Sequence, residues 1–314
     1  MRVFRQHSLY LRVSVTDRCP LRCFYCCPMK TRKGAPKQEV LRYEEIIHLV
    51  NAFIHFGVRK VRITGGEPLV RPNIDFLLRE LNSLSSVPSL GLTTNGTRLD
   101  HFVTVLAKTR FKVNCHIDTL DSVRYRQIMG GGDITRVVDS LKALVDCRVP
   151  VKINSVVTKE TSYDDCDSLV AFGALHKIPV RFIEMMPASK SIVEETSPSH
   201  IEILKRQLIE RWALYPVGRD GVASMFKGLG SEALVGFIMP SDSHYCDNCL
   251  RFRLSARGML RTCLYSREGV DLRAVLREGD QKRLFEAIEI AIARKCLGLG
   301  REGKRIEAMW EIGG

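Results

Sequence analysis

The sequence lacks a long apolar run. No uninterrupted apolar stretch approaches the roughly 20 residues that a helix needs to cross a bilayer. The first segment, residues 1–15, carries arginines through its apolar run and lacks the hydrophobic core of a signal peptide. We therefore expect no membrane association and a cytoplasmic location.

The sequence also lacks a long basic tail, a low-complexity segment and any internal repeat beyond an alternation of strands and helices. It nevertheless holds 48 Lys and Arg residues against 35 Asp and Glu residues, a net charge of +13. Such a charge attracts anions such as nucleotides, although a solvated basic surface explains most of it. The cysteine motifs have no flanking basic-aromatic repeats, so we expect no nucleic-acid partner.

Cysteine is abundant, with 11 residues in 314. Because disulfides are rare in the cytoplasm, this number indicates metal or redox use. Cys19, Cys23 and Cys26 have C-x3-C-x2-C spacing, with Tyr25 before the last cysteine. Three thiolates on one loop can hold a [4Fe–4S] cluster and leave its fourth iron open to a small molecule. A zinc knuckle completed by Cys27 is the alternative, but adjacent cysteines are poorly placed for one tetrahedron.

A second cluster motif contains Cys246, Cys249 and Cys263 in C-x2-C-x13-C spacing. Three thiolates could hold a second open [4Fe–4S] cluster. With Cys296 or His244 as a fourth ligand, the same spacing fits a zinc ribbon. The residues alone leave both possibilities open.

Two arginines lie inside this second motif. Arg251 and Arg253 alternate on a predicted strand and should point to one face. Two guanidinium groups beside an open metal site suit phosphate binding, whereas an exposed strand face is the alternative. The chain ends in Gly313 and Gly314, which form either a frayed tail or a segment thin enough to enter a narrow pocket.

Strand-like and helix-like segments alternate through the first part of the chain. We predict strands at 11–15, 60–63, 89–92, 112–117, 151–157 and 180–184. We predict helices at 43–56, 74–84, 97–108, 134–147, 163–176 and 200–212. Six βα units fall short of a closed eight-stranded barrel, so the predicted fold is α/β: a partial (β/α)6 TIM-like barrel. We assign it to residues 1–220, followed by a C-terminal α+β extension, residues 221–314, with the second cluster and the Gly-Gly tail.

This topology predicts the position of the active site. In a parallel barrel, the functional loops follow the carboxyl ends of the strands. The first cysteine loop, the segment TGGEP and the segment TTNG each follow a predicted strand. The glycines of GGEP let the backbone approach a ligand closely and aim a carbonyl at an ammonium group. The alternative interpretation is that they only form a tight turn between a strand and a helix.

The first cysteine motif and GGEP resemble the radical SAM superfamily. In that superfamily the open iron binds S-adenosylmethionine (SAM), and electron transfer cleaves it to a 5′-deoxyadenosyl radical. Further segments resemble one family within it, the GTP 3′,8-cyclases of molybdenum cofactor biosynthesis. These segments are RITGGEPLVRP, VNCHIDTLD, VKINSVV, FIEMMP, CDNCLRFRLSARGMLRTCL and the terminal Gly-Gly.

The resemblance implies a lyase that converts GTP to (8S)-3′,8-cyclo-7,8-dihydroguanosine 5′-triphosphate with two [4Fe–4S] clusters and SAM. It implies two ligand triads, Cys19, Cys23 and Cys26 for one cluster and Cys246, Cys249 and Cys263 for the other. It implies SAM contacts at Tyr25, Gly66, His116 and Met186. It implies GTP contacts at Arg12, Arg62, Thr93, Lys152, Arg251, Phe252 and Arg253. It implies catalytic roles for Arg251, Arg253, Gly313 and Gly314.

The resemblance also implies partners: GTP, a reductant, a downstream cyclic pyranopterin monophosphate synthase and a homodimeric partner. The sequence departs from the family at three positions: His116 replaces a Ser, Leu250 replaces an Asn, and Arg257 replaces an acidic residue. Two alternatives follow: a radical SAM peptide maturase with an auxiliary cluster, and a zinc-containing nucleic-acid-binding protein. The first would need a peptide-recognition extension, and none stands out.

Overall fold

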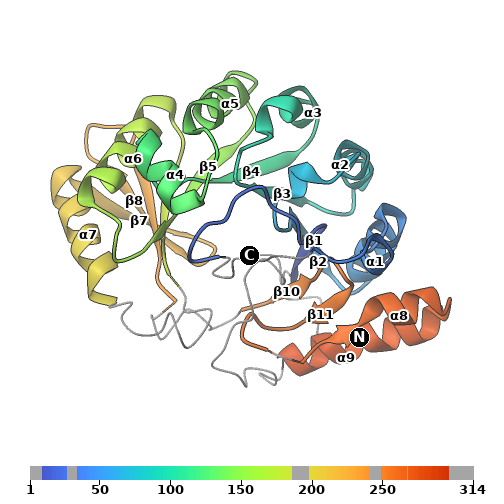
Figure 1. The fold of residues 1–314 in the computed structure, drawn as a ribbon. Helices are drawn as coiled ribbons and strands as arrows, with labels where there is room; N and C mark the ends of the chain where they lie inside the picture. Colours follow the sequence, from blue (N-terminus) through green and yellow to red (C-terminus); the bar gives the residue numbers. More distant parts are fainter. Residues whose placement is uncertain (1–8, 27–33, 186–197, 241–248, 267, 297–314) are drawn as a thin grey trace.

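The computed structural model describes residues 9–26, 34–185, 198–240, 249–266 and 268–296. A single curved sheet of 12 strands forms the centre of the molecule, and helices cover its outer face (Figure 1). The strand order is β12-β11-β10-β1-β2-β3-β4-β5-β6-β9-β8-β7, so the described strands do not close into a complete barrel.

The six predicted strands form the middle of this sheet in sequence order, and each pair of neighbours is parallel. They are β1 (Leu9–Ser14), β2 (Val58–Thr64), β3 (Ser89–Thr94), β4 (Phe111–His116), β5 (Val151–Val157) and β6 (Val180–Glu184). The helices that follow them are α1 (Tyr43–His55), α2 (Ile74–Ser83), α3 (Val103–Ala107), α4 (Ser122–Met129), α5 (Ile134–Asp146), α6 (Tyr163–His176) and α7 (Pro198–Arg211). The predicted partial (β/α)6 barrel is therefore confirmed.

Two predictions about helices need correction. The helix expected at 97–108 is instead a 3-10 helix, η4 (Leu99–Phe102), followed by the short α3. The helix α4 was not predicted. Its apolar positions form only a weak stripe, and Asp121 starts it by accepting hydrogen bonds from two backbone N–H groups. Two further 3-10 helices are η2 (Lys37–Glu39) and η3 (Pro68–Val70).

The C-terminal part extends the same sheet at both edges. Strand β9 (Leu234–Ile238) pairs parallel with β6, and β10 (Arg251–Leu254) pairs parallel with β1. The outer strands β7 (Leu214–Asp220), β8 (Ala223–Gly228), β11 (Met259–Arg261) and β12 (Val270–Asp271) are antiparallel additions. The sequence predicted a strand at β10 but not β7, β8 or β9.

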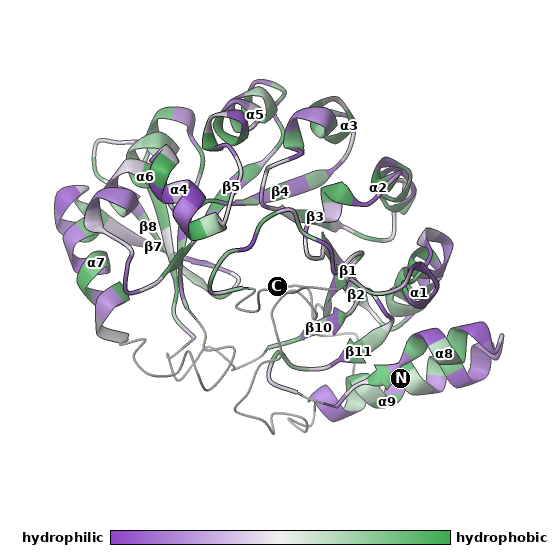
Figure 2. Cartoon of the chain, viewed as in Figure 1, coloured by the Kyte–Doolittle hydropathy of each residue, from purple (hydrophilic) through white to green (hydrophobic). Residues whose placement is uncertain are grey.

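Apolar and polar residues alternate along the strands, so the sheet has one apolar face and one polar face. Residues such as Leu11, Val13 and Ile63 are fully buried and belong to the apolar core beneath the helices. The intervening residues are mostly polar and point to the inner face of the curved sheet. Figure 2 shows hydrophilic colouring within strands β4 and β10 as well as on the helices.

Two helices of the C-terminal part, α8 (Leu272–Arg277) and α9 (Gln281–Cys296), pack beside α1 (Figure 1). Arg277 on α8 donates to both carboxylate oxygens of Glu45 on α1, at 2.7 and 3.1 Å. This ion pair ties the extension to the barrel. In the described part of the chain, no helix has the length and apolar character that crossing a membrane requires.

Candidate functional site

The loops at the carboxyl edge of the sheet are tied to one another by hydrogen bonds. The backbone N–H of Gly66 donates to the carbonyl of Thr16 at 2.6 Å, which joins GGEP to the start of the cysteine loop. The side-chain amide of Asn95, after β3, donates to the sulfur of Cys19 at 3.4 Å. Three segments that the sequence placed at the rim therefore meet there.

Close backbone packing at Gly65 and hydrogen bonds to Glu67 fix the GGEP turn. A Cβ atom at Gly65 would lie 2.7 Å from the carbonyl oxygen of Thr16, so a larger residue does not fit. Glu67 is fully buried and accepts hydrogen bonds from the backbone N–H groups of Leu69 and Asn95 and from the hydroxyl of Thr94. Burial raises the pKa of Glu67 to about 7 despite these three donors.

Tyr25 and His116, two predicted SAM contacts, touch each other. The Tyr25 hydroxyl contacts Nε2 of His116 and donates to Oδ2 of Asp118 at 2.5 Å. Oδ1 of Asp118 accepts from the backbone N–H of Val156 at 2.7 Å, which orients the carboxylate. Burial lowers the pKa of His116, but the charge and hydrogen bonding of Asp118 outweigh burial and raise it. A histidine–aspartate pair thus stands beside the cysteine loop, with Nε2 of His116 3.3 Å from Oδ2 of Asp118.

Cationic side chains line the inner face of the sheet. Register pairs Arg253 of β10 with Arg12 of β1, and Arg12 with Arg62 of β2. Arg62 is opposite Gly91 of β3, where a Cβ atom would lie 2.8 Å from the guanidinium. The arginines therefore form a row across three strands, and Gly91 leaves the space that Arg62 occupies.

Arg62 is buried, with 7% of its surface exposed, and its guanidinium is held by three hydrogen bonds. Its Nε donates to the Tyr10 hydroxyl at 2.7 Å, and its Nη1 donates to the carbonyl of Leu92 at 3.2 Å and to Oγ1 of Thr93 at 3.3 Å. Burial alone would raise the pKa of Tyr10, but Arg12, Arg62 and Lys60 lower it to about 8. The lowered pKa of Tyr10 indicates that several positive charges lie close together in the interior.

A second group of cations lies further round the sheet. Lys152 of β5 and Arg181 of β6 both contact Oδ2 of Asp220, the last residue of β7. Burial lowers the pKa values of Lys152 and Arg181, whereas Asp220 raises them. The charges of Asp220 and Arg181 also affect the pKa of Lys60, so both groups belong to one electrostatic cluster.

Phe252 differs from its neighbours on β10. It is fully buried, and its ring lies 6.4 Å from that of Phe53 on α1. Its side chain therefore faces the helix-covered core, opposite to Arg251 and Arg253. The Phe252 side chain therefore does not line the interior, and its GTP contact stays a prediction that only its backbone groups could fulfil.

The two cysteine sites lie at opposite ends of this cation-lined interior. Cys249 precedes the amino end of β10, whereas Cys19 follows the carboxyl end of the parallel neighbour β1. Strand β1 has six residues and thus spans on the order of 20 Å. An elongated anion could therefore lie between the two sites.

Comparison with known proteins identifies the family. The model of the radical SAM superfamily matches residues 13–173, and that described as Molybdenum Cofactor Synthesis C matches residues 178–298. The GTP 3′,8-cyclase of Clostridium botulinum (strain Okra, type B1) is 36% identical over 315 residues, 97% of each chain. That of Thermodesulfovibrio yellowstonii is 35% identical over 318 residues, 99% of each chain. This chain belongs to the GTP 3′,8-cyclase family of radical SAM proteins.

Solved structures agree with this assignment at the level of fold. Streptococcus suis SuiB bound to S-adenosylmethionine superposes with a TM-score of 0.64 at 19% identity, over 90% of this chain and 68% of SuiB. SuiB bound to its precursor peptide SuiA gives a TM-score of 0.66 at 18% identity, over 90% and 66% of the two chains. The radical SAM fold is therefore shared.

The first cysteine triad fits the cluster expected of a radical SAM protein. Cys19, Cys23 and Cys26 are half-buried thiols on one loop. Burial raises the pKa of Cys23, and Cys26, Asp118 and Cys19 raise it further. Because the three sulfurs act on one another in a partly buried space, their thiolate forms need a compensating cation, which an iron–sulfur cluster supplies. No three His, Cys, Asp or Glu side chains in the described ranges surround a point suited to a single metal ion.

The second triad of this family member is described only in part, because Cys246 lies outside the described residues. Burial would raise the pKa of Cys249, but Arg251 and Lys295 lower it to about 7. The Nε of Arg251 donates to the Cys249 sulfur at 3.3 Å, and Nζ of Lys295 lies 3.8 Å from it. A thiol made acidic by two cations is a suitable iron ligand. Cys263 is a half-buried thiol, whereas Cys296 is exposed.

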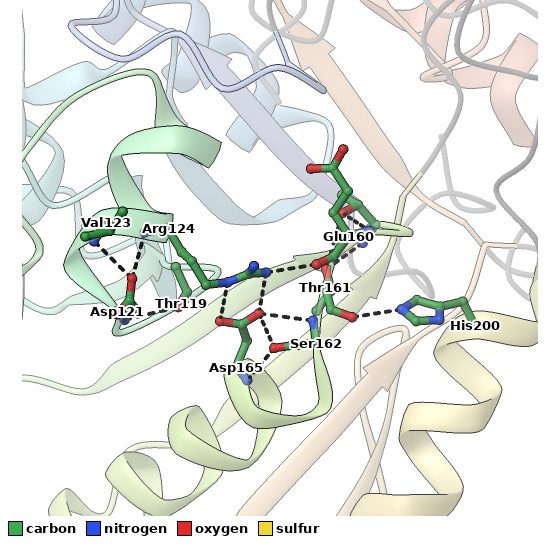
Figure 3. A network of polar contacts seen from close by, with 10 residues as sticks. Thr119, Asp121, Val123, Arg124, Glu160, Thr161, Ser162, Asp165 and His200 are labelled. Atoms are coloured by element: carbon green, nitrogen blue, oxygen red, sulfur yellow. Dashed lines mark hydrogen bonds and ion pairs between the residues drawn. The ribbon is translucent and has the colours of Figure 1, made fainter.

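An ion-pair network supports the rim of the radical SAM barrel (Figure 3). Arg124 of α4 donates to both oxygens of Asp165 on α6, at 3.1 and 2.7 Å, and to the carbonyl of Glu160. Asp165 also accepts from the backbone and hydroxyl of Ser162, which begins α6. His200 on α7 contacts the carbonyl of Thr161 at 2.9 Å. The loop between β5 and α6 is thereby fixed to its neighbours.

Sequence reasoning missed several residues of the interior cluster. Tyr10, Lys60, Arg181 and Asp220 were not predicted as site residues, although the first three occupy polar positions of alternating strands, a signal that could have found them. Asp220 had no such signal because β7 was not recognised. The predicted roles of Met186, Cys246, Gly313 and Gly314 fall outside the described residues and stay predictions.

Proposed function

We propose that this chain is itself a GTP 3′,8-cyclase, which converts GTP to (8S)-3′,8-cyclo-7,8-dihydroguanosine 5′-triphosphate in molybdenum cofactor biosynthesis. The observation that carries the proposal is the cation-lined interior between two cysteine sites. Nearly full-length relatives at 35–36% identity bear this name. A peptide substrate would have no comparable need for a cluster of buried cations.

The interior is suited to a triphosphate. A nucleoside triphosphate carries about four negative charges and binds best to charge-assisted donors. The cations available for it are Arg12, Lys60, Arg62, Lys152, Arg181, Arg251 and Arg253. Within the described residues, the buried Nε of Arg181 has no hydrogen-bond partner, so it is a donor available to a ligand. By fixing the phosphates, these residues would hold the ribose and the base in one reactive arrangement.

The cofactor positions follow from the cysteine sites. Cys19, Cys23 and Cys26 would hold the first [4Fe–4S] cluster, which supplies the electron for reductive cleavage of SAM. Tyr25, Gly66 and His116 lie beside this loop and would contact SAM, together with Met186. Cys246, Cys249 and Cys263 would hold the second cluster, which in the family that the chain resembles holds the guanine base of GTP.

The test is anaerobic reconstitution with iron and sulfide, followed by incubation with SAM, dithionite and GTP. We expect 5′-deoxyadenosine and a cyclised nucleotide. Arg251→Ala and Arg253→Ala should each abolish GTP cyclisation and leave uncoupled SAM cleavage. Arg257→Ala is the control, because this side chain is 54% exposed and pairs with Glu39 on the surface. Full cyclisation by both interior variants would contradict the proposal.

Several parts of the prediction remain proposals of their own. A cytoplasmic location is expected from the lack of a membrane-length apolar run and of a signal-peptide core. A reductant, a downstream cyclic pyranopterin monophosphate synthase and a homodimer are further expected partners. The likeness to SuiB concerns the fold alone and gives no support to a peptide substrate. Iron and sulfide content of the reconstituted protein distinguishes the enzyme from a zinc-containing nucleic-acid-binding protein.

A further inference from the structure

Asp220 is an acid in the middle of a cation cluster. It ends β7 and contacts Lys152 and Arg181 through one carboxylate oxygen, Oδ2. Both cations belong to the set that would bind the triphosphate. A carboxylate edge offers the same kind of acceptor as a phosphate edge. Asp220 thus occupies donors that a phosphate group would need.

Burial indicates which partner can leave. Only 11% of the Arg181 side chain is exposed to solvent, whereas 44% of the Asp220 side chain is. Burial also lowers the pKa of Arg181, and nearby Arg62 lowers it further, so the guanidinium needs an anion beside it. The carboxylate can return to water at lower cost than the guanidinium.

The backbone around Asp220 permits such a movement. It lies at the tip of the β7–β8 hairpin, between Gly218 and Gly221, which have positive φ values of 108° and 64°. No other heavy atom lies within 4 Å of a Cβ position built on either glycine. The tip is therefore not packed against the barrel at these positions, and glycine adopts alternative backbone conformations readily.

We propose that Asp220 is a built-in stand-in for phosphate: it holds Lys152 and Arg181 in place in the empty enzyme and is displaced by the triphosphate. This inference rests on the proposed function. A carboxylate that stayed beside a bound phosphate would repel it across a partly buried space. Asp220 therefore lowers the affinity for every polyphosphate, and only a ligand that brings more negative charge than one carboxylate displaces it. Its role is to position two cations and to select for charge.

The experiment measures binding of inorganic tripolyphosphate and of GTP to the reconstituted enzyme by isothermal titration calorimetry. We expect Asp220→Asn to bind tripolyphosphate about tenfold more tightly than the wild type, equivalent to ~1.4 kcal/mol. Asp220→Glu keeps the charge and should stay within about twofold of the wild type. Glu232→Gln removes the same charge from an exposed turn between β8 and β9 and is the matched control. It should have no effect.

A second measurement detects the stand-in role directly. Without ligand, Asp220→Asn should melt at a lower temperature than the wild type, because two cations lose their anion. Tripolyphosphate should then raise its melting temperature by more than it raises that of the wild type. Equal or weaker tripolyphosphate binding by Asp220→Asn, with normal binding by the wild type, would overturn the inference alone. Failure of the wild type to bind either tripolyphosphate or GTP would instead overturn the proposed function.

Discussion

Gly91→Ala offers the sharpest test of how the interior is built. The new Cβ atom would stand 2.8 Å from Cζ and Nη2 of Arg62, and 3.2 Å from its Nε. Nonbonded carbon atoms pack at about 3.5 to 4.0 Å, so the guanidinium must move away. The substitution changes no residue proposed to touch GTP, and alanine fits a strand without backbone strain.

The magnitude follows from the bonds that hold Arg62. Its guanidinium donates to Tyr10 at 2.7 Å, to Leu92 at 3.2 Å and to Thr93 at 3.3 Å. Only 7% of the residue is exposed, so water cannot replace a lost partner. A hydrogen bond from a charged group contributes about 1.5 to 3 kcal/mol. Loss of one such bond to the ligand, at about 2 kcal/mol, would weaken GTP binding about 30-fold.

The assay is calorimetric GTP binding to reconstituted enzyme, arranged as a double-mutant cycle with Arg62→Ala. If alanine at 91 acts only through Arg62, the double variant should bind GTP as weakly as Arg62→Ala alone. Ser89→Ala, one interior position earlier on β3, adds no atom and is the control. Wild-type affinity in Gly91→Ala, or additive losses in the double variant, would refute the reasoning.

Two further predictions concern titratable groups. His116 has a pKa raised by Asp118, so its imidazole stays protonated to a higher pH than a free imidazole; if it donates to the SAM carboxylate, SAM affinity should fall as pH rises and this donor loses its charge. His116→Ser should bind SAM about three- to tenfold more weakly at pH 7 and show a flatter profile between pH 6 and 8.5; an unchanged slope would count against this role. Glu45 tends toward a higher pKa through burial, but Arg277 and Arg42 lower it to about 2. The stabilisation that Glu45 contributes is fully present above its pKa in the unfolded chain, near 4.5. It is lost as pH falls toward its folded-state pKa, about 2. Glu45→Gln should therefore lower the free energy of unfolding in urea by about 1 to 2 kcal/mol at pH 7, discounted because Arg277 is 39% exposed, and by less below pH 4; a pH-independent difference would contradict the ion pair.

Local sequence patterns predicted the barrel and its functional edge well. Strands β5 and β6 and helix α6 begin and end at the predicted residues, because their apolar periodicity and flanking signals agree. The loops after β1, β2, β3 and β4 meet as parallel topology requires. The cysteine spacing and the arginine pair of β10 were likewise visible in the chain itself.

The sequence by itself therefore determined the six central strands and most of the helices between them, since each depends on residues close together in the chain, whereas the two cysteine triads stay predicted ligand sets. Only the tertiary structure decided that β9 and β10 extend the parallel sheet at both edges, and that Phe252 faces the core. It alone showed that Gly91 makes room for Arg62 and that Asp220 meets Lys152 and Arg181. These arrangements join residues far apart in sequence, and the order and register of the strands, not local periodicity, bring them together.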